Sequence, residues 1–376
     1  MAIALVSAVL IASCGDDPDP VVVAPPPSPA PSEPSAPPPS PVPPTPAASP
    51  TPTKKAVARS LPAPGNPDGH AAVPAEAKAV DTGRPDRVIG DGTPASCTSD
   101  AVVKAVAAGG IITFDCGPAP VTITMTRTAK IRNANGPRIV LDGGGRVTLS
   151  GGGKRRILYL NTCDAAQGHT TSHCQDQDHP RLTVQNLALK DGNSTGEKQE
   201  GGGGGAIFAR GGRVKIVGVR FAGNRCDPTG PDLGGAAVRV LDQSGDKPVY
   251  VVGSTFTGGQ CSNGGALSSI GVSWVVLNSV FEDNRAIGRG ANPAKSGTPG
   301  GGSGGAIYTD GNRFTVSVSG SVIRDNDARE GGGAIFFVSN DRTGTMTIRN
   351  STLRNNRSRG FENSPGIFFL GARLTR

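Results

Sequence analysis

The sequence predicts an all-β protein in which one β-rich unit is repeated along a solenoid. Three observations predict it: only three of the 55 glycines lie in residues 1–80, aromatic residues make up 4% of the chain, and a Gly-Gly-Ala motif recurs five times. Frequent glycine disfavours long helices, and so few aromatic rings disfavour the usual compact core. A β-rich unit that recurs every 28 to 40 residues indicates stacked turns that share one core.

The N-terminus is expected to direct export and to carry a lipid. Residues 2–12 are apolar, which suits the core of a signal peptide and is too short to cross a bilayer. The residues Ile11-Ala12-Ser13-Cys14 resemble the lipobox of bacterial lipoproteins, in which signal peptidase cuts before a cysteine that becomes diacylated. The resemblance implies a signal peptide over residues 1–13 and lipidation of Cys14. The alternative is an ordinary cleaved signal that happens to precede a cysteine.

A proline-rich segment follows, with 17 of the 33 prolines between residues 18 and 52. Proline removes amide donors and favours the extended polyproline II conformation. We therefore expect residues 14–80 to be the lipidated cysteine and a disordered linker that reaches about 110 Å when extended. Residues 81–376 are then the β-helix domain.

The net charge of +8 is unevenly distributed. Residues 1–80 contribute −2 and the remainder +10. A basic body favours contact with an anionic polymer or a membrane surface, although solubility alone is an equally simple explanation. We expect a monomer and no nucleic-acid partner.

The chain has seven cysteines, an odd number that lipidation of Cys14 explains. Six cysteines then remain, an even set for an oxidising compartment. Sequence order suggests the disulfides Cys97–Cys116, Cys163–Cys174 and Cys226–Cys261. The third pair has separate support, because Cys226 and Cys261 each follow a phenylalanine of the repeat by five residues and should therefore lie on adjacent turns.

The repeat region, residues 204–376, has two signatures. The first is the Gly-Gly-Ala motif, which begins at Gly204, Gly234, Gly264, Gly304 and Gly332. The second is an apolar residue followed three positions later by asparagine or glycine, at Phe221, Phe256, Phe281, Ile323 and Leu353, and Leu189 fits the same frame. Glycine or asparagine three residues before each anchor indicates a left-handed corner. The asparagines that follow the anchors can form an amide ladder along the stack.

A helix is expected over Ser99–Ala108, with Thr98 or Ser99 as its N-cap and Gly109-Gly110 at its end. Its valines form one apolar face, so the helix can cover the exposed edge of the first coil. Strands are expected to follow at Ile111–Phe114, Val121–Met125, Ile139–Leu141 and Val147–Leu149.

Together, the paired GGAI and FxxN signatures resemble the repeats of the polymorphic outer-membrane protein family. The wider pattern is similar to the right-handed parallel β-helix, or pectate-lyase-like, superfamily. The resemblance covers about residues 111–376 and implies a right-handed parallel β-helix with a short N-terminal capping helix. It is specific for the fold and weak for function, because this scaffold carries lyases, hydrolases, adhesins and inert stalks.

Enzymes of this superfamily usually attack acidic polysaccharides, and the signatures of pectate lyases and polygalacturonases are missing here. A uronate lyase often holds Ca²⁺ with carboxylates, and a hydrolase needs two carboxylates at a set distance. The weak catalytic candidates are Asp242, Asp310 and Asp341, which follow Gly-Gly-Ala strands. The alternative is that they are turn residues. No cofactor is expected, except Ca²⁺ if the protein is a lyase.

Three of the four histidines lie between Cys163 and His179. His169, His173 and His179 suggest a zinc site as a weak alternative, but neither CxxC nor HExxH spacing occurs. A loop closed by a disulfide explains the same cysteines without a metal.

Arginine follows the repeat asparagine three times, at Arg225, Arg285 and Arg357. If the turns are in register, these arginines form a column that suits carboxylate or sulfate groups of a polymer. The alternative is that charge solvates a sheet edge and prevents aggregation.

The sequence therefore favours a surface-displayed lipoprotein that binds extracellular or envelope polymer, with acidic polysaccharide as the expected ligand, or that acts in adhesion. Its place is a bacterial cell surface or periplasm, on the outer membrane in a Gram-negative cell. A divergent polysaccharide lyase or glycoside hydrolase is the alternative, and an inert spacer is the third.

Overall fold

The structure, a computed structural model, describes residues 62–197 and 202–376. Residues 1–13, Cys14 and the linker up to residue 61 lie outside the described residues. Within the described part, strands from successive coils pair in parallel and form four sheets, which confirms the predicted parallel β-helix.

Sheets A and B contribute the first two strands of most coils. Sheet A consists of β1 (Arg87–Ile89), β2 (Gly110–Phe114), β5 (Arg138–Asp142), β8 (Arg181–Gln185), β11 (Arg213–Val217), β14 (Val249–Val252), β18 (Trp274–Leu277), β22 (Thr315–Ser319), β26 (Thr345–Arg349) and β30 (Arg373–Thr375). Sheet B consists of β3 (Val121–Thr124), β6 (Val147–Ser150), β9 (Ala188–Lys190), β12 (Arg220–Ala222), β15 (Thr255–Thr257), β19 (Val280–Glu282), β23 (Val322–Arg324) and β27 (Thr352–Arg354).

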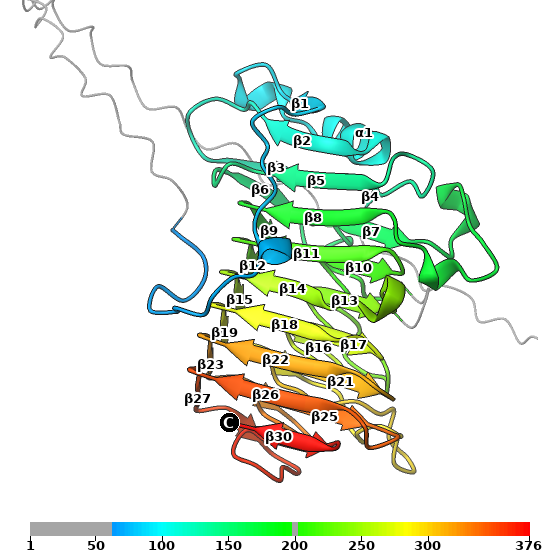
Figure 1. Cartoon of the computed structure of the whole chain (residues 1–376), viewed down its shortest axis with the longest axis vertical. Helices are drawn as coiled ribbons and strands as arrows, with labels where there is room; N and C mark the ends of the chain where they lie inside the picture. The colour runs from blue at the N-terminus through cyan, green and yellow to red at the C-terminus, as the bar shows by residue number, and fades with distance from the viewer. Residues whose placement is uncertain (1–61, 198–201) are drawn as a thin grey trace, which may run out of the picture. The chain divides into compact units, whose positions relative to one another are not determined.

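Sheets D and C close each coil. The short sheet D consists of β16 (Gln260–Cys261), β20 (Arg285–Ala286), β24 (Asp327–Ala328) and β28 (Arg357–Ser358). Sheet C consists of β4 (Ala129–Lys130), β7 (Leu158–Asn161), β10 (Ile207–Arg210), β13 (Val238–Leu241), β17 (Leu267–Ile270), β21 (Ile307–Gly311), β25 (Ile335–Ser339) and β29 (Ile367–Leu370). In Figure 1 the strands of sheet A run leftward across the front, and the chain returns behind them one coil lower, so the solenoid is right-handed.

The helix α1 (Ser99–Ala108) caps the N-terminal end of the stack, as predicted. The Thr98 hydroxyl accepts a hydrogen bond from the Ala101 amide, and Gly109 ends the helix with a φ of 73°. Val102 and Val106 are buried in the main core, so the helix shields the first coil from edge-to-edge pairing.

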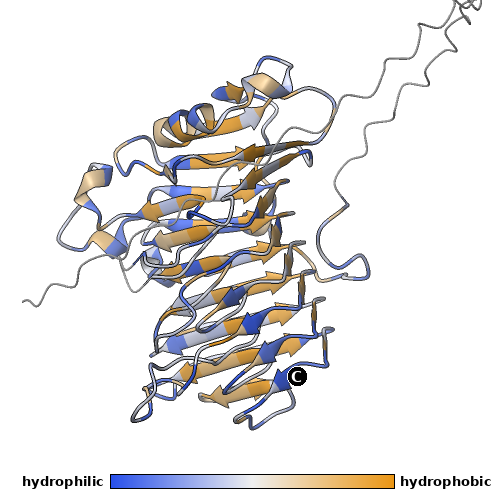
Figure 2. Ribbon diagram, turned by 180° about the vertical axis from the view of Figure 1, so that it is seen from behind, coloured by the Kyte–Doolittle hydropathy of each residue, from blue (hydrophilic) through white to orange (hydrophobic). Residues whose placement is uncertain are grey.

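The apolar anchors of the repeat stack inside the solenoid. Leu189, Phe221, Phe256, Phe281, Ile323 and Leu353 occupy one column through consecutive strand pairs. The three phenylalanine rings stack at centroid distances of 4.5 and 4.6 Å. Figure 2 shows the apolar positions of the strands recurring from coil to coil. The repeat alignment made on these anchors is therefore confirmed.

The second Gly-Gly-Ala motif is shifted by one residue from the predicted alignment. Ile207 pairs with Val238 rather than with Ala237. The first position of the motif needs a positive φ, which Gly204 has at 63° and Gly235 at 69°. Gly235 therefore takes the place that the sequence alignment gave to Gly234, which keeps the buried Val238 in register with Ile207.

The predicted linker ends earlier than residue 80. Residues 62–80 run along the outer face of sheet A and include a 3-10 turn at Ala75–Ala77 (Figure 1). Ala77 is buried against Val252 and Leu277. Asn278 exchanges two hydrogen bonds with the Ala71 backbone, at 2.8 and 2.9 Å. We call residues 62–86 the strap.

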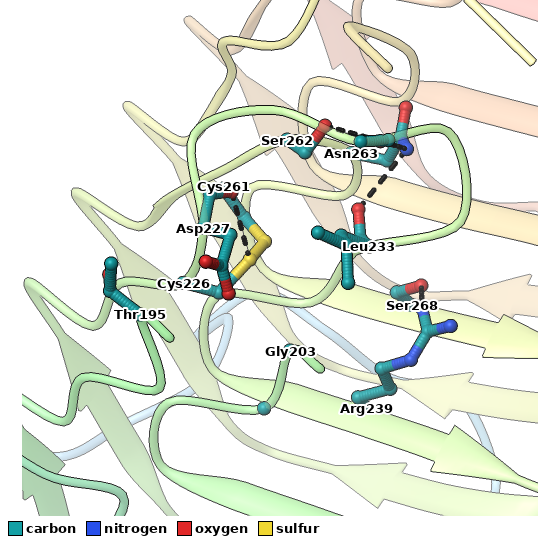
Figure 3. The surroundings of a disulfide bond; sticks show 12 residues. Thr195, Gly203, Cys226, Asp227, Leu233, Arg239, Cys261, Ser262, Asn263 and Ser268 are labelled. Carbon is teal, nitrogen blue, oxygen red and sulfur yellow. Dashed lines mark hydrogen bonds between the residues drawn. A yellow bond between two sulfur atoms is a disulfide. The ribbon is translucent and has the colours of Figure 1, made fainter. Parts of the chain in front are cut away.

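All three predicted disulfides are present. Cys97–Cys116 links the segment before α1 to the segment after β2, and Cys163–Cys174 closes a loop. Cys226–Cys261 joins adjacent coils, with a Cα–Cα distance of 4.7 Å (Figure 3). In sheet D, Cys261 faces the interior in register with Ala286, which is followed by Ala328. These small side chains leave the narrow space that a bridge between coils occupies.

Candidate functional site

The structure places Arg225, Arg285 and Arg357 at the same position along the sheet D edge, and all three are exposed. They do not lie on adjacent coils. Gln260 separates the first two, and Asp327 separates the last two. Consecutive arginines are therefore about 9.6 Å apart, twice the strand spacing.

The residue between the last two arginines is itself charged and paired. The Asp327 carboxylate accepts hydrogen bonds from the guanidinium of Arg359 at 2.8 and 3.1 Å. This edge therefore alternates cation, amide and anion. It lacks the unbroken positive column that we expected to clamp successive acidic groups.

The three candidate aspartates do not share one site. Asp242 and Asp310 line the same cavity on sheet C, and Asp341 does not line it. Asp341 accepts hydrogen bonds from Ser339 and Thr343 in a turn. The backbone amide of Thr343 is the main cause that lowers the pKa of Asp341 below its ordinary value. This aspartate has the role of a turn residue.

Asp310 and Asp242 have different kinds of partner at the sheet C cavity. Asp310 accepts from the Tyr308 hydroxyl and the Asn292 amide, both at 3.0 Å. The same Asn292 nitrogen donates to Asp232 at 2.7 Å, and Asp242 lies 3.9 Å from Arg210. The cavity has a volume of about 590 Å³.

The histidines are only partly brought together. His169 and His179 line a cavity of about 570 Å³ beside the loop at residues 133–137, and His173 is not among its lining residues. In residues 62–197 and 202–376, no group of three or more histidine, cysteine, aspartate or glutamate side chains could hold a metal ion. The zinc alternative therefore has no support from the geometry.

A groove of about 1320 Å³ lies on the outer face of sheet A. The strap contributes Glu76, Val80 and Asp86 to its lining, and the floor is made by sheet A. Six basic side chains line it, against the two acidic ones of the strap: Arg87, Arg138, Arg181, Arg213, Lys215 and Lys247. We call this surface the basic groove.

Three of these arginines stand in one row. Arg138, Arg181 and Arg213 each begin a strand, and they are direct register partners in β5, β8 and β11. Adjacent strands are about 4.8 Å apart, so the guanidinium groups follow one another coil by coil. Arg138 and Arg181 are exposed, and Arg213 is half-buried.

One carboxylate braces the row at its edge. Asp178 forms ion pairs with Arg181 and with Arg213, the latter at 2.5 Å. Both arginines keep more than a third of their side chains exposed, and a guanidinium has five N–H donors. Asp178 therefore orients these two groups and leaves donors available to a ligand.

Lys215 of β11 helps to hold the strap against the groove. Lys215 Nζ donates to the Glu76 and Lys78 carbonyl oxygens at 3.1 and 2.7 Å. Among the residues that the structure describes, these two neutral carbonyls are its hydrogen-bond partners. Burial lowers the pKa of Lys215 below its ordinary value. The Tyr250 hydroxyl donates to the Glu76 carboxylate at 3.2 Å, which fixes the acidic side chain at the border of the groove.

Sequence reasoning missed the basic groove, although a signal existed. Arg138-Ile-Val-Leu, Arg181-Leu-Thr-Val and Arg213-Val-Lys-Ile all place arginine before an alternating apolar strand. Aligning these three segments would have put the arginines in one row. The part played by the strap had no such signal, because its segment was expected to be linker.

No helix among the described residues is long and apolar enough to cross a membrane. No family model matches the chain, and no curated protein or solved structure matches it. The fold is therefore established by the stacked parallel sheets, and the pectate-lyase-like and polymorphic outer-membrane resemblance stays a prediction.

Proposed function

We propose that this chain is an exported lipoprotein that binds an acidic polysaccharide in the basic groove. The observation that carries the proposal is the row of Arg138, Arg181 and Arg213 on adjacent strands of sheet A. Arginine presents planar N–H donors that match carboxylate and sulfate oxygens. A row at the strand spacing, about 4.8 Å, suits an extended polymer that lies along the solenoid axis and offers one acidic group after another.

The setting of the row supports a polymer rather than a single small anion. The groove of about 1320 Å³ is lined from Gly110 in β2 to Tyr250 in β14, so it spans several coils. The three disulfides fit an oxidising compartment. The expected lipid on Cys14 would hold the protein at a membrane. The proline-rich segment would separate this lipid from the β-helix.

The direct test measures binding of polygalacturonate to the full chain at low and high salt, with neutral dextran as the control polymer. We expect saturable binding of polygalacturonate only, with weaker binding at high salt because exposed charges are screened. The variant Arg138→Gln/Arg181→Gln/Arg213→Gln should weaken binding about ten- to hundredfold, since three contacts of about 0.5–1 kcal/mol each are lost.

The matched control is Arg225→Gln/Arg285→Gln/Arg357→Gln, which removes the same charge from the sheet D edge. We expect it to change affinity by less than about threefold, through the long-range field alone. Equal losses of affinity in the two variants would show that the row contributes only nonspecific charge. No binding by the unaltered protein would leave the spacer role as the better account.

The anchor needs its own test. Cys14→Ala should move the protein from the membrane fraction to the soluble fraction of the cell, because a lipid on this cysteine is the proposed attachment. Ser13→Ala keeps the cysteine and serves as the control. A Cys14→Ala protein that stays with membranes would contradict the lipoprotein proposal and leave the groove untouched.

The enzyme alternative keeps one supporting observation, that Asp242 and Asp310 line a common cavity. Incubating the protein with polygalacturonate and measuring new reducing ends and unsaturated products separates cleavage from binding. Product formation that Asp310→Asn abolishes would favour the enzyme.

A further inference from the structure

Arg239 is a fully buried cation with almost no partners. Its side chain is 1% exposed. Nη1 donates to the Ser268 hydroxyl at 2.8 Å (Figure 3). Nε has no acceptor, and the residue forms no ion pair with any described residue. A buried charge without a counter-ion destabilises the folded chain.

The neighbouring Arg156 is a buried guanidinium whose polar groups have several partners. Arg156 is 2% exposed, and it donates to the Gly203 and Gly204 carbonyls at 2.9 and 3.1 Å. Glu197 lies 3.7 Å away, and the rings of Tyr159 and Phe208 face the guanidinium. Arg239 has no carbonyl acceptor, no ion pair and no facing ring among the described residues. Burial lowers its pKa to about 10, and only the weaker attraction of Tyr308 and Asp232 opposes that effect.

Arg239 lines the cavity of about 590 Å³ on the outer face of sheet C. The apolar side chains of Leu241, Ile270 and Val338 line the same cavity, as do Asp232 and Asn292. The cavity therefore joins a cation without an ion pair among the described residues, an apolar surface and an exposed carboxylate, Asp232.

The charges around the cavity select the kind of anion. Three aspartates and two arginines line it, so the lining is negative overall and disfavours a dianion such as sulfate. Asp310 already accepts four hydrogen bonds, from Tyr308, Asn292, Gly311 and Asn340. It has little capacity to bind Arg239 in addition. A ligand with a single negative charge would neutralise Arg239. It would be repelled less by the aspartate carboxylates of the lining than a ligand with two negative charges.

We propose that the sheet C cavity binds a small hydroxylated monocarboxylate, such as a sugar acid. Its carboxylate accepts hydrogen bonds from the Arg239 guanidinium, a charge-assisted contact. Its hydroxyl groups donate to Asp232, and its C–H groups lie against Leu241 and Ile270. The site is separate from the basic groove, which lies on sheet A.

The test is calorimetric titration of the full chain with D-gluconate, next to D-glucitol, which is the same polyol without the carboxylate, and inorganic sulfate. We expect saturable binding of gluconate and a ligand-dependent rise in Tm. We expect neither from glucitol or sulfate at the same concentration. Equal binding of glucitol would show that the carboxylate and Arg239 play no part, and would overturn the proposal.

Arg239→Met should weaken gluconate binding at least about tenfold, while the Tm without ligand stays level or rises because an unpaired charge has been removed. Arg156→Met is the matched control. It should lower the Tm, because it removes satisfied contacts, and keep the gluconate affinity within about twofold.

Ile270 is a half-buried residue of the cavity lining. Ile270→Trp should fill the cavity with a larger side chain and abolish binding, while the charge of Arg239 is unchanged. Unchanged affinity in both Arg239→Met and Ile270→Trp, or no gluconate binding by the unaltered protein, would overturn the proposal. The groove variant Arg138→Gln/Arg181→Gln/Arg213→Gln should bind gluconate normally, so failure of the polymer proposal and failure of this one are distinguishable.

Discussion

Asn326 connects the coils on either side of its own through side-chain hydrogen bonds. Its Oδ1 accepts from the Asn284 side-chain amide at 2.9 Å, and its Nδ2 donates to Asn356 Oδ1 at 2.8 Å. The ladder is interrupted at Gly259, where a Cβ would lie 1.9 Å from the Gly265 carbonyl oxygen. The predicted ladder of asparagine side chains is therefore broken at this coil, because the backbone of the neighbouring Gly-Gly-Ala motif leaves no room for a side chain at position 259.

Asn326→Ala should lower the free energy of unfolding by about 1–3 kcal/mol, because the buried Asn284 and the half-buried Asn356 each lose a hydrogen bond. Urea unfolding followed by circular dichroism measures the change. Asn312→Ala, at an exposed position, is the control and should stay within about 0.5 kcal/mol. Equal effects of the two substitutions would show that the ladder adds no stability.

At the scale of elements, the strap is the part of the chain that changes the outer surface of the β-helix. It packs Ala77 into a small apolar cluster with Val252 and Leu277. It also binds Gln185 through the Val80 backbone, at 2.8 and 2.9 Å. Because of these contacts, the strap forms one side of the basic groove and the outer face of sheet A forms its floor.

Ala77→Asp should detach the strap, because a carboxylate buried at that position costs several kcal/mol. Limited proteolysis with mass spectrometry should show cleavage within residues 62–86 at least about tenfold faster. Ala75→Asp places the same charge at an exposed position of the same turn and should leave cleavage unchanged. Slow cleavage in both variants would contradict the packing role of Ala77.

The sequence was informative where the structure depends on residues close together or on repeated positions. The left-handed corners at Gly218, Gly253 and Asn278 adopt positive φ, as their residue types predicted, and the Cys226–Cys261 bridge followed from the spacing after the anchors. The row of groove arginines depends on pairing between strands that begin 43 and 32 residues apart, at Arg138, Arg181 and Arg213. The strap depends on tertiary packing of a segment whose composition favours an extended chain.

At the scale of the whole molecule, a rigid solenoid presents three different charged surfaces. Sheet A carries the basic groove, sheet C carries the cavity with Arg239, and sheet D carries an edge in which Asp327 separates Arg285 from Arg357. Of these three surfaces of the described residues, the one on sheet A gathers basic side chains into a contiguous lining. Total charge alone could not distinguish these surfaces.

The pH dependence of polymer binding should reflect the polymer rather than the groove. Four of the six cations are arginines, which stay protonated at all ordinary pH values. Binding of polygalacturonate should be level between pH 5 and 8 and fall as the pH drops through about 4, where uronate carboxylates become protonated. Dextran sulfate, which keeps its charge, should bind equally well at pH 3.5 and at pH 7.

At alkaline pH, Lys215 determines how polymer binding changes. Its lowered pKa means that it loses its charge at a lower pH than an ordinary lysine, so binding should already weaken modestly at that lower pH. Lys215→Arg should remove this early decline. Loss of dextran sulfate binding at pH 3.5 would instead indicate that the protein itself changes at acid pH.

The most direct measurement of the central claim is arginine modification by phenylglyoxal, mapped by mass spectrometry with and without a polygalacturonate oligomer. The account predicts that the oligomer protects Arg138, Arg181 and Arg213 from modification and leaves Arg225, Arg285 and Arg357 as reactive as in the free protein. Protection of the sheet D arginines with no protection in the groove would contradict it.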